Sequence, residues 1–171
     1  MAAKLNLPRL VAVDTNVALD FAKGIEDVCD AIATIQTRIA GAELLLPPTV
    51  MEELAHASVS SLDREVQKAA TKMLRQHRTL GFRLVSFIPL GFDQVEHIAE
   101  RLRYQRLLPE EEVHDAMIIV EAAALGCALL TSSDAELAGV DREKLALELS
   151  RFDLTAPVVA TPREIVKKFF R

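Results

Sequence analysis

Five short apolar runs recur along the chain, at residues 10–13, 44–46, 84–88, 127–131 and 158–159. Continuous apolar runs of this length are typical of strands that are buried on both faces, as in a parallel sheet. Pro157 restricts the last run to a short or edge strand, because proline cannot donate a hydrogen bond to a strand ladder. The pattern predicts a mostly parallel central sheet of about five strands.

The longer stretches between these runs place their apolar residues at helical spacing. In residues 25–40 an apolar side chain recurs every three or four positions, and Gly41 follows as a helix stop. Helices are predicted over residues 25–40, 49–57, 62–80, 92–107, 109–125 and 162–170. Pro109 and Pro162 would each lie in the first turn of a helix. Strands that alternate with helices in this way predict a three-layer α/β/α sandwich.

The length and composition of the chain are typical of one ordered domain, which we expect to span residues 1–171. Half of the residues are apolar and 26% are charged. Cys29 and Cys127 lack the spacing of a metal site, so we expect core thiols in a reducing cytoplasm. No membrane span is expected, because the most apolar stretch, residues 116–130, contains Glu121 and is too short. No export signal is expected either.

The formal net charge of −5 argues against a protein that holds nucleic acid by a broad basic surface. An enzyme whose acids are concentrated in one site is still compatible with this charge. Arg101, Arg103 and Arg106 could contact a phosphate backbone while Tyr104 stacks on a base. The competing interpretation is an exposed helix end, where the helix dipole favours cations. The three arginines are therefore only candidate nucleic-acid-binding residues.

Asp14 and Asp134 each follow a predicted strand, the first and the fourth. The carboxyl ends of parallel strands lie at one edge of a sheet, which is where ligands bind in such folds. The two carboxylates should therefore meet at that edge. For Asp134 the alternative is a structural role, because aspartate often caps a helix that follows a strand.

Two further acids lie on predicted helices. Asp115 sits within an apolar helical pattern, where an unpaired carboxylate beside a buried face is costly to ionise. Near the start of its helix it would point over the sheet edge, whereas the alternative is a solvated acid favoured by the helix dipole. On the other helix, a rotation of about 100° per residue puts Glu53 nearer than Glu52 to the face of Val50 and Leu54. Glu53 is therefore the predicted site residue.

Carboxylates gathered at one edge would raise one another's pKa unless a cation neutralised them. Oxygen ligands without Cys or His favour Mg²⁺ or Mn²⁺. The predicted metal ligands are Asp14, Asp115 and Asp134, with Glu53 as the fourth acid. Such ions polarise a phosphoryl oxygen and lower the pKa of an attacking water. The four acids therefore predict hydrolysis of a nucleic-acid phosphodiester.

Four segments of the chain carry a resemblance to one family. They are Val-Ala-Val-Asp-Thr-Asn-Val at 11–17, Pro-Pro-Thr-Val-Met-Glu-Glu-Leu at 47–54, His-Asp-Ala-Met-Ile-Ile-Val-Glu-Ala at 114–122 and Leu-Leu-Thr-Ser-Ser-Asp-Ala-Glu-Leu at 129–137. In this order and spacing, and with the tail Val-Val-Ala-Thr-Pro-Arg-Glu at 158–164, they resemble the PIN-domain nucleases, which include the VapC-type toxin ribonucleases. The resemblance spans nearly the whole chain and implies a PIN-like fold.

The resemblance implies a role for each matching residue. The implied catalytic acids are Asp14, Glu53, Asp115 and Asp134. Supporting roles fall to Thr15, Asn16 and a hydroxyl residue near the last acid, either Thr131 or Ser132. The family usually places a threonine two residues before that acid. Here Ser132 holds this position and Thr131 stands one residue early, so the choice between the two hydroxyls stays open.

The resemblance also implies a substrate and partners. The predicted activity is an endoribonuclease that cuts RNA with Mg²⁺ or Mn²⁺, with a protein antitoxin or a second copy of the chain as partner. One rival function is a PIN-like module that binds RNA or protein without cutting, for which a loss of acids would be expected. The other is a phosphatase with Asp14 as nucleophile. Such enzymes place a second acid two residues on, where this chain has Asn16.

Overall fold

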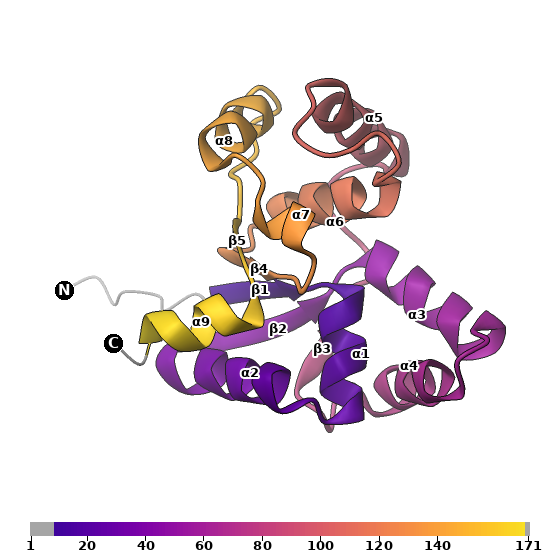
Figure 1. The fold of residues 1–171 in the computed structure, drawn as a ribbon. Coiled ribbons are helices and arrows are strands. Elements are labelled where there is room, and N and C mark those ends of the chain that lie inside the picture. The colour runs from indigo at the N-terminus through magenta and orange to yellow at the C-terminus, as the bar shows by residue number, and fades with distance from the viewer. Residues whose placement is uncertain (1–8, 170–171) are drawn as a thin grey trace.

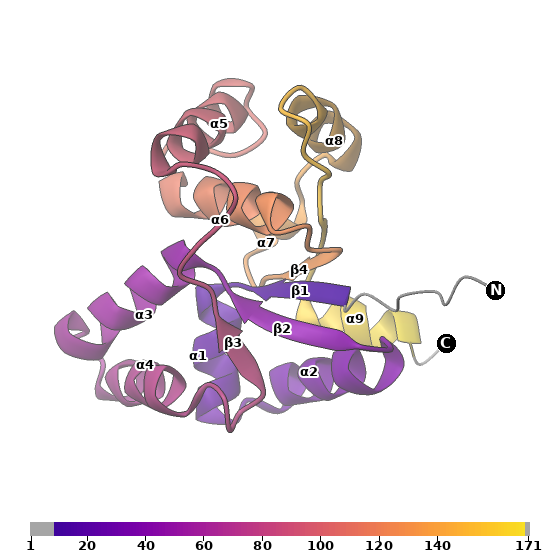
Figure 2. The same cartoon turned by 180° about the vertical axis from the view of Figure 1, so that it is seen from behind.

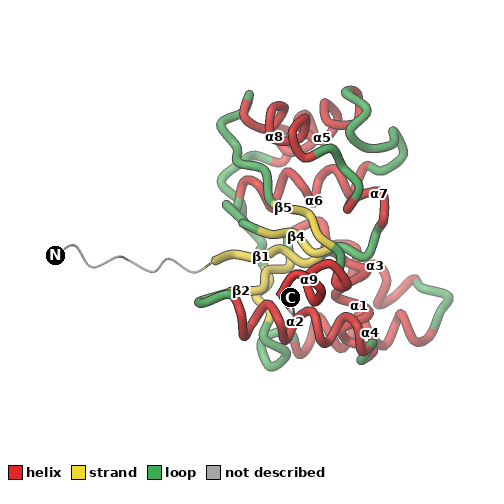
Figure 3. The backbone as a smooth tube through the Cα atoms, turned by 60° about the vertical axis from the view of Figure 1, so that its left-hand side comes forward, coloured by secondary structure: helices red, strands yellow, loops and turns green. Residues whose placement is uncertain are grey.

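The computed structural model describes residues 9–169 of the chain. Its strands are β1 (Arg9–Val13), β2 (Ala42–Leu46), β3 (Phe82–Leu84), β4 (Leu129–Thr131) and β5 (Val158–Ala160). They form one sheet in the order β3-β2-β1-β4-β5, and Figure 3 shows β5, β4, β1 and β2 side by side. Every neighbouring pair is parallel. The predicted parallel sheet is confirmed, with β5 at an edge as Pro157 indicated.

Helices cover both faces of this sheet. In chain order they are α1 (Thr15–Lys23), α2 (Glu26–Arg38), α3 (Pro48–Ser60), α4 (Arg64–Gln76), α5 (Phe92–Tyr104), α6 (Val113–Ala124), α7 (Ala135–Ala138), α8 (Arg142–Ser150) and α9 (Pro162–Phe169). Figures 1 and 2 show α1, α2 and α9 on one face and α6 on the other, with α5 and α8 outside α6. α3 packs against both α4 and α6. The predicted three-layer α/β/α sandwich is confirmed.

The chain order reverses across the sheet at β1. β2 and β3 lie on one side of β1, whereas β4 and β5 lie on the other. Open parallel sheets bind ligands outside the carboxyl ends of their strands at such a reversal. Val13 pairs with Thr131 at the ends of β1 and β4, and the backbone N–H of Asp14 donates to the Thr131 carbonyl at 3.1 Å. The residues that follow β1 and β4 therefore emerge side by side.

The core is apolar where the pattern predicts it. Leu45 of β2 and Leu130 of β4 are fully buried, as expected for strands covered by helices on both faces. α6 is buried at residues 116–123 because it lies between the sheet and α5. Within that buried stretch the one charged side chain is Glu121, which is 3% exposed.

The predicted third strand, residues 84–88, is wrong in position, because β3 spans Phe82–Leu84. The last register pair between β2 and β3 joins Leu46 to Leu84. The two residues after Leu46 are prolines, which carry no backbone N–H and cannot continue a ladder. The apolar residues after Leu84 therefore leave the sheet even though they continue the apolar run.

Two predicted helices have different ends. The helix predicted over residues 92–107 ends at Tyr104, because Arg106 adopts a left-handed backbone conformation with φ 57°. The helix predicted from Pro109 begins only at Val113, because a hydrogen-bonded turn that starts at Pro109 comes first. The proline that indicates a helix start and the first residue of the helix are thus separated by one turn of the chain.

The other predicted helices correspond to α2, α3, α4 and α9, with ends that differ by a few residues. α1, α7 and α8 have no counterpart among the predicted helices. Phe170, which the predicted terminal helix included, lies outside the described residues. Among residues 9–169, no helix is long and apolar enough to cross a membrane.

We predict that Leu45→Ala lowers the free energy of unfolding by roughly 2–5 kcal/mol, because it leaves a cavity between the helical layers. The matched control is Leu147→Ala on α8, where the side chain is 59% exposed and the change should stay within about 0.5 kcal/mol. Urea unfolding followed by circular dichroism measures both. Equal effects at the two positions would contradict the placement of β2 in the core.

Candidate active site

Asp14 is the first residue after β1 and the N-cap of α1. It is only 3% exposed, and both carboxylate oxygens accept hydrogen bonds. The backbone N–H of Asn16 donates to Oδ1 at 2.6 Å, and the Ser132 hydroxyl donates to Oδ2. Burial raises the pKa of Asp14 to about 6 despite these bonds, and the charges of Glu53 and Asp134 add to the rise. The carboxylate is thus held in one orientation, and no cationic side chain within residues 9–169 offsets its charge.

The two hydroxyls before Asp134 occupy different environments. Ser132 is buried, donates to Asp14 and accepts a hydrogen bond from the backbone N–H of Asp134 at 3.0 Å. Thr131 is also buried, but its Oγ1 has no hydrogen-bond partner among the described residues. Ser132 is therefore the hydroxyl that links the two acids at the sheet edge.

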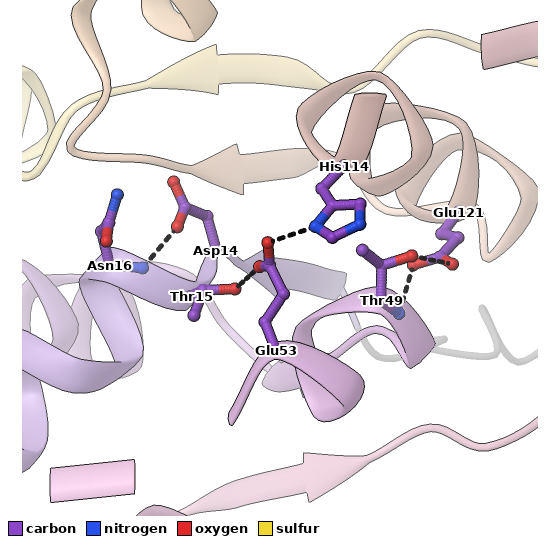
Figure 4. A network of polar contacts seen from close by, with 7 residues as sticks. All are labelled: Asp14, Thr15, Asn16, Thr49, Glu53, His114 and Glu121. Carbon is purple, nitrogen blue, oxygen red and sulfur yellow. Dashed lines mark hydrogen bonds and ion pairs between the residues drawn. The ribbon is translucent and has the colours of Figure 1, made fainter. Parts of the chain in front are cut away.

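Glu53, in the second turn of α3, reaches toward both α1 and α6. Thr15 Oγ1 donates to one of its oxygens, and His114 Nδ1 lies 2.8 Å from the other. Because an ionised carboxylate only accepts, the imidazole nitrogen is the donor. Figure 4 shows the Glu53 carboxylate between Thr15 and His114. Glu52 is exposed, as expected of a surface residue, although it also lines the same pocket.

Asp115 lies in the first turn of α6, where it is half-buried. Burial raises its pKa to about 7, and the nearby charges of Asp14 and Glu112 add to the rise. A first-turn position favours the ionised form through the helix dipole, so a solvated acid there would not be expected to show such a rise. The later start of α6, at Val113, is what leaves Asp115 in this first turn.

Asp134 begins α7 as its N-cap. Its Oδ1 accepts hydrogen bonds from the backbone N–H groups of Glu136 at 2.7 Å and Leu137 at 3.1 Å. The capping role that the sequence left open is therefore present. The charge of Asp134 nevertheless helps to raise the pKa of both Asp14 and Asp115. Asp134 thus combines a helix cap with a position beside the other acids.

Three of the four acids converge on one pocket of about 530 Å³, formed by the starts of α1 and α6 and the middle of α3. Asp14, Glu53 and Asp115 line it, whereas Asp134 is not among the lining residues. Within residues 9–169, no three His, Cys, Asp or Glu side chains lie close enough to hold one metal ion as they stand. The structure therefore gathers the acids without closing them into a cage.

The donor chemistry of the pocket fits a hard divalent cation. Mg²⁺ is usually held by one or two protein carboxylates together with waters and substrate phosphates, so a closed cage of side chains is not required. The raised pKa values of Asp14 and Asp115 show that burial and like charges disfavour their ionised forms. A cation between them would supply the opposite charge that the described side chains do not.

None of the three arginines predicted to bind nucleic acid lines the acidic pocket. Arg101 Nε donates to Glu148 at 2.9 Å, and an Arg103 guanidinium nitrogen donates to the Glu110 carbonyl at 2.6 Å. Arg103 and Arg106 line a different pocket, and none of the three lines the acidic one. Contact of these arginines with nucleic acid therefore stays a prediction.

Several residues of this region were not predicted as site residues. His56 and His114 line the pocket, and Glu121 accepts two hydrogen bonds from Thr49 at the contact between α3 and α6. A signal for Glu121 exists, because it is a single charge within an apolar helical stretch. No sequence signal could pair it with Thr49, which stands 72 residues earlier.

Comparison with known proteins identifies the family. The family model described as PIN domain matches residues 11–143, whereas the comparison with curated proteins found no matching relative. This chain is similar to a chain in the crystal structure of VapBC2 from Rickettsia felis bound to a DNA fragment from the VapBC2 promoter. The TM-score is 0.58 and the sequence identity is 10%. The match covers 89% of this chain and 98% of that chain, and at this identity it shows the fold alone.

The matched residues include Asp14, Glu53, Asp115 and Asp134. The matched segment is also more than three quarters of the chain, and it begins within β1 and includes β2, β3 and β4. PIN domains are generally nucleases, which agrees with the resemblance noted from the sequence motifs. This chain belongs to the PIN-domain family.

Proposed function

We propose that this protein is a divalent-metal-dependent endoribonuclease. The observation that carries the proposal is the convergence of Asp14, Glu53 and Asp115 on one pocket, with Asp134 beside them. Membership of a family that generally consists of nucleases supports phosphodiester hydrolysis as the reaction. RNA is the proposed substrate because the sequence motifs resemble the VapC-type ribonucleases.

Asp14, Asp115 and Asp134 would hold the cation, either Mg²⁺ or Mn²⁺. When bound, such an ion polarises a phosphoryl oxygen and lowers the pKa of an attacking water. Asn16 and Ser132 keep both oxygens of Asp14 in place, so little reorganisation is needed there. Without a cation the acidic pocket repels a phosphodiester, which is itself an anion.

Glu53 completes the acidic side of the pocket from α3. Thr15 and His114 orient its carboxylate, and we propose that it aligns the attacking water. This assignment makes Thr15 and Asn16 supports of the site from the first turn of α1. Thr131, whose hydroxyl is buried without a partner among the described residues, has no assigned role at the reacting atoms.

The proposed setting is a toxin-antitoxin pair. The similar solved structure is that of a VapBC2 complex bound to promoter DNA, so a protein antitoxin is the proposed partner of this chain. From the same family resemblance we also expect that the chain forms a homodimer and that the protein is cytoplasmic.

A second candidate is a PIN-like module that binds RNA or protein without cutting. The observation that favours it is the lack, within residues 9–169, of three ligating side chains already in place for one ion. The four acids favour the nuclease, because a binding module would have no need of carboxylates that repel the RNA backbone. A test for RNA cleavage distinguishes the nuclease from the binding module.

The decisive experiment is cleavage of a labelled RNA pool by the purified protein with Mn²⁺. Asp115→Asn should lower kcat/KM by at least about 100-fold, because it removes a charge that helps to hold the cation, whose effect is worth several kcal/mol. Asp141→Asn, a change at the N-cap of α8, is the control and should cut at the wild-type rate. Equal rates for wild type and Asp115→Asn would remove Asp115 from the mechanism, and no cleavage by the wild type would favour the binding module.

Metal binding should also be visible as thermal stability. At a concentration about 100 times the dissociation constant, Mn²⁺ should raise the Tm by roughly 5–10 °C. Asp14→Asn should abolish this rise, although asparagine still caps α1. Asp63→Asn, at the N-cap of α4, should keep it. Indifference of the wild-type Tm to Mn²⁺ would count against the metal site.

The pH dependence of stability tests the raised pKa of Asp115. Its folded pKa is about 7 and its ordinary value is 3.8, so between these values the folded state binds more protons than the unfolded state. In EDTA, its contribution to the free energy of unfolding should therefore become less favourable as the pH rises from about 4 to about 7. Across this window, urea unfolding should show the free energy of unfolding of Asp115→Asn rising relative to that of the wild type as the pH rises. A constant difference between the two proteins would contradict the raised pKa.

A further inference from the structure

Glu121 is a buried carboxylate of α6 whose partners lie on α3. The backbone N–H of Thr49 donates to one carboxylate oxygen at 3.1 Å, and the Thr49 hydroxyl donates to the other at 2.7 Å. Both residues are 3% exposed. Figure 4 shows this contact on the far side of Glu53 from Asp14. A buried carboxylate with two donors from one residue holds that residue in a defined place.

The start of α3 has no cap of its own. Its N-cap is Pro47 and its first helical residue is Pro48, so no neighbouring side chain accepts from the free N–H groups. Helices usually meet this need with a Ser, Thr, Asp or Asn at the N-cap. Here Glu121 accepts from the Thr49 N–H at the positive end of the helix dipole. Glu121 therefore caps α3 from a distant part of the sequence.

Two polar bridges join α3 to α6 along one contact. The buried bridge is Glu121 with Thr49, and the outer bridge is His114 with Glu53 at 2.8 Å. Thr49 and Glu53 stand four residues apart on α3, and His114 and Glu121 stand seven residues apart on α6. Each pair therefore lies on one face of its helix. Because the two bridges share the same helices, a shift of α3 at Thr49 moves Glu53 as well.

A carboxylate in this position is costly by itself. Burial raises the pKa of Glu121, and the charges of Glu52 and Glu53 add to the rise. Replacing a buried ionic group by a well-packed apolar one is often neutral or stabilising. The effect of Glu121 that an apolar residue could not reproduce is the orientation of the first turn of α3.

We propose that Glu121 is a positioning residue that caps α3 and thereby holds Glu53 at the active site. The proposal rests on the proposed function, because it takes Glu53 as a member of the acidic site. It assigns Glu121 no contact with metal or substrate. Its effect on the reaction passes through Thr49 and the first two turns of α3.

The first test measures Mn²⁺ affinity by calorimetry and kcat and KM on the labelled RNA pool. Glu121→Gln should weaken Mn²⁺ binding by about 10-fold, as is common for residues that support metal ligands, and lower kcat more than it changes KM. Thr49→Val keeps the backbone donor and removes only the hydroxyl, so it should give a smaller loss. Thr49→Ser keeps both donors and should retain the wild-type Mn²⁺ affinity and kcat.

The matched control is Glu148→Gln on α8. Glu148 is also a buried glutamate, paired with Arg101 and Arg151, and it is not part of the acidic pocket. Its substitution should lower the Tm while leaving Mn²⁺ affinity and kcat unchanged. If Glu148→Gln and Glu121→Gln lower Mn²⁺ affinity equally, the effect of Glu121 is one of general stability and the proposal is overturned.

The second test needs neither metal nor RNA. A double-mutant cycle on urea unfolding compares Thr49→Val, Glu53→Gln and the double variant, because Thr49→Val weakens the buried bridge without removing the Glu121 charge that repels Glu53. If the buried bridge positions the outer one, loss of the first reduces the effect of losing the second, so the two changes are not additive. Additive changes would overturn the proposal.

The two tests separate this inference from the proposed function. A wild-type protein that neither binds Mn²⁺ nor cuts RNA contradicts the proposed function, yet a non-additive unfolding cycle would still support the positioning of Glu53 by Glu121. A protein that cuts RNA and shows an additive cycle keeps the proposed function and loses the positioning role.

Discussion

The parallel pairing of β1 with β4 is the constraint on which the rest of the site depends. It ends both strands at the same level and is extended by the hydrogen bond from Asp14 to the carbonyl of Thr131. The chain then leaves both strands side by side, so Ser132 can donate to Asp14 and accept from Asp134. Two acids that are far apart in sequence are thus joined by one short hydrogen-bonded path.

The site holds its carboxylates in place without neutralising them. Asp14 accepts from the Asn16 N–H and Glu53 accepts from the Thr15 hydroxyl. These donors orient the oxygens but bring no full positive charge. Burial and mutual repulsion therefore raise the pKa of Asp14 and Asp115. Holding like charges this close lowers the stability of the fold, and a cation bound between them would relieve that repulsion.

Much of the fold follows from local patterns in the sequence, because buried parallel strands need continuous apolar runs and their covering helices need apolar stripes. The position of Asp14 after such a run was sufficient to place it at the sheet edge. The third strand and the start of α6 were misplaced because strand pairing and turn geometry decide them. The prolines after Leu46 stop the ladder, and the turn at Pro109 delays the helix.

By itself the sequence determined the layered architecture and the acids that lie at its carboxyl edge, since both depend on residue order and periodicity along one chain. Only the tertiary structure decided which hydroxyl serves Asp14, that Asp134 also caps a helix, and that the candidate arginines do not line the acidic pocket. It also decided that Glu121 meets Thr49, because contacts between separate helices depend on packing angles that no local pattern encodes.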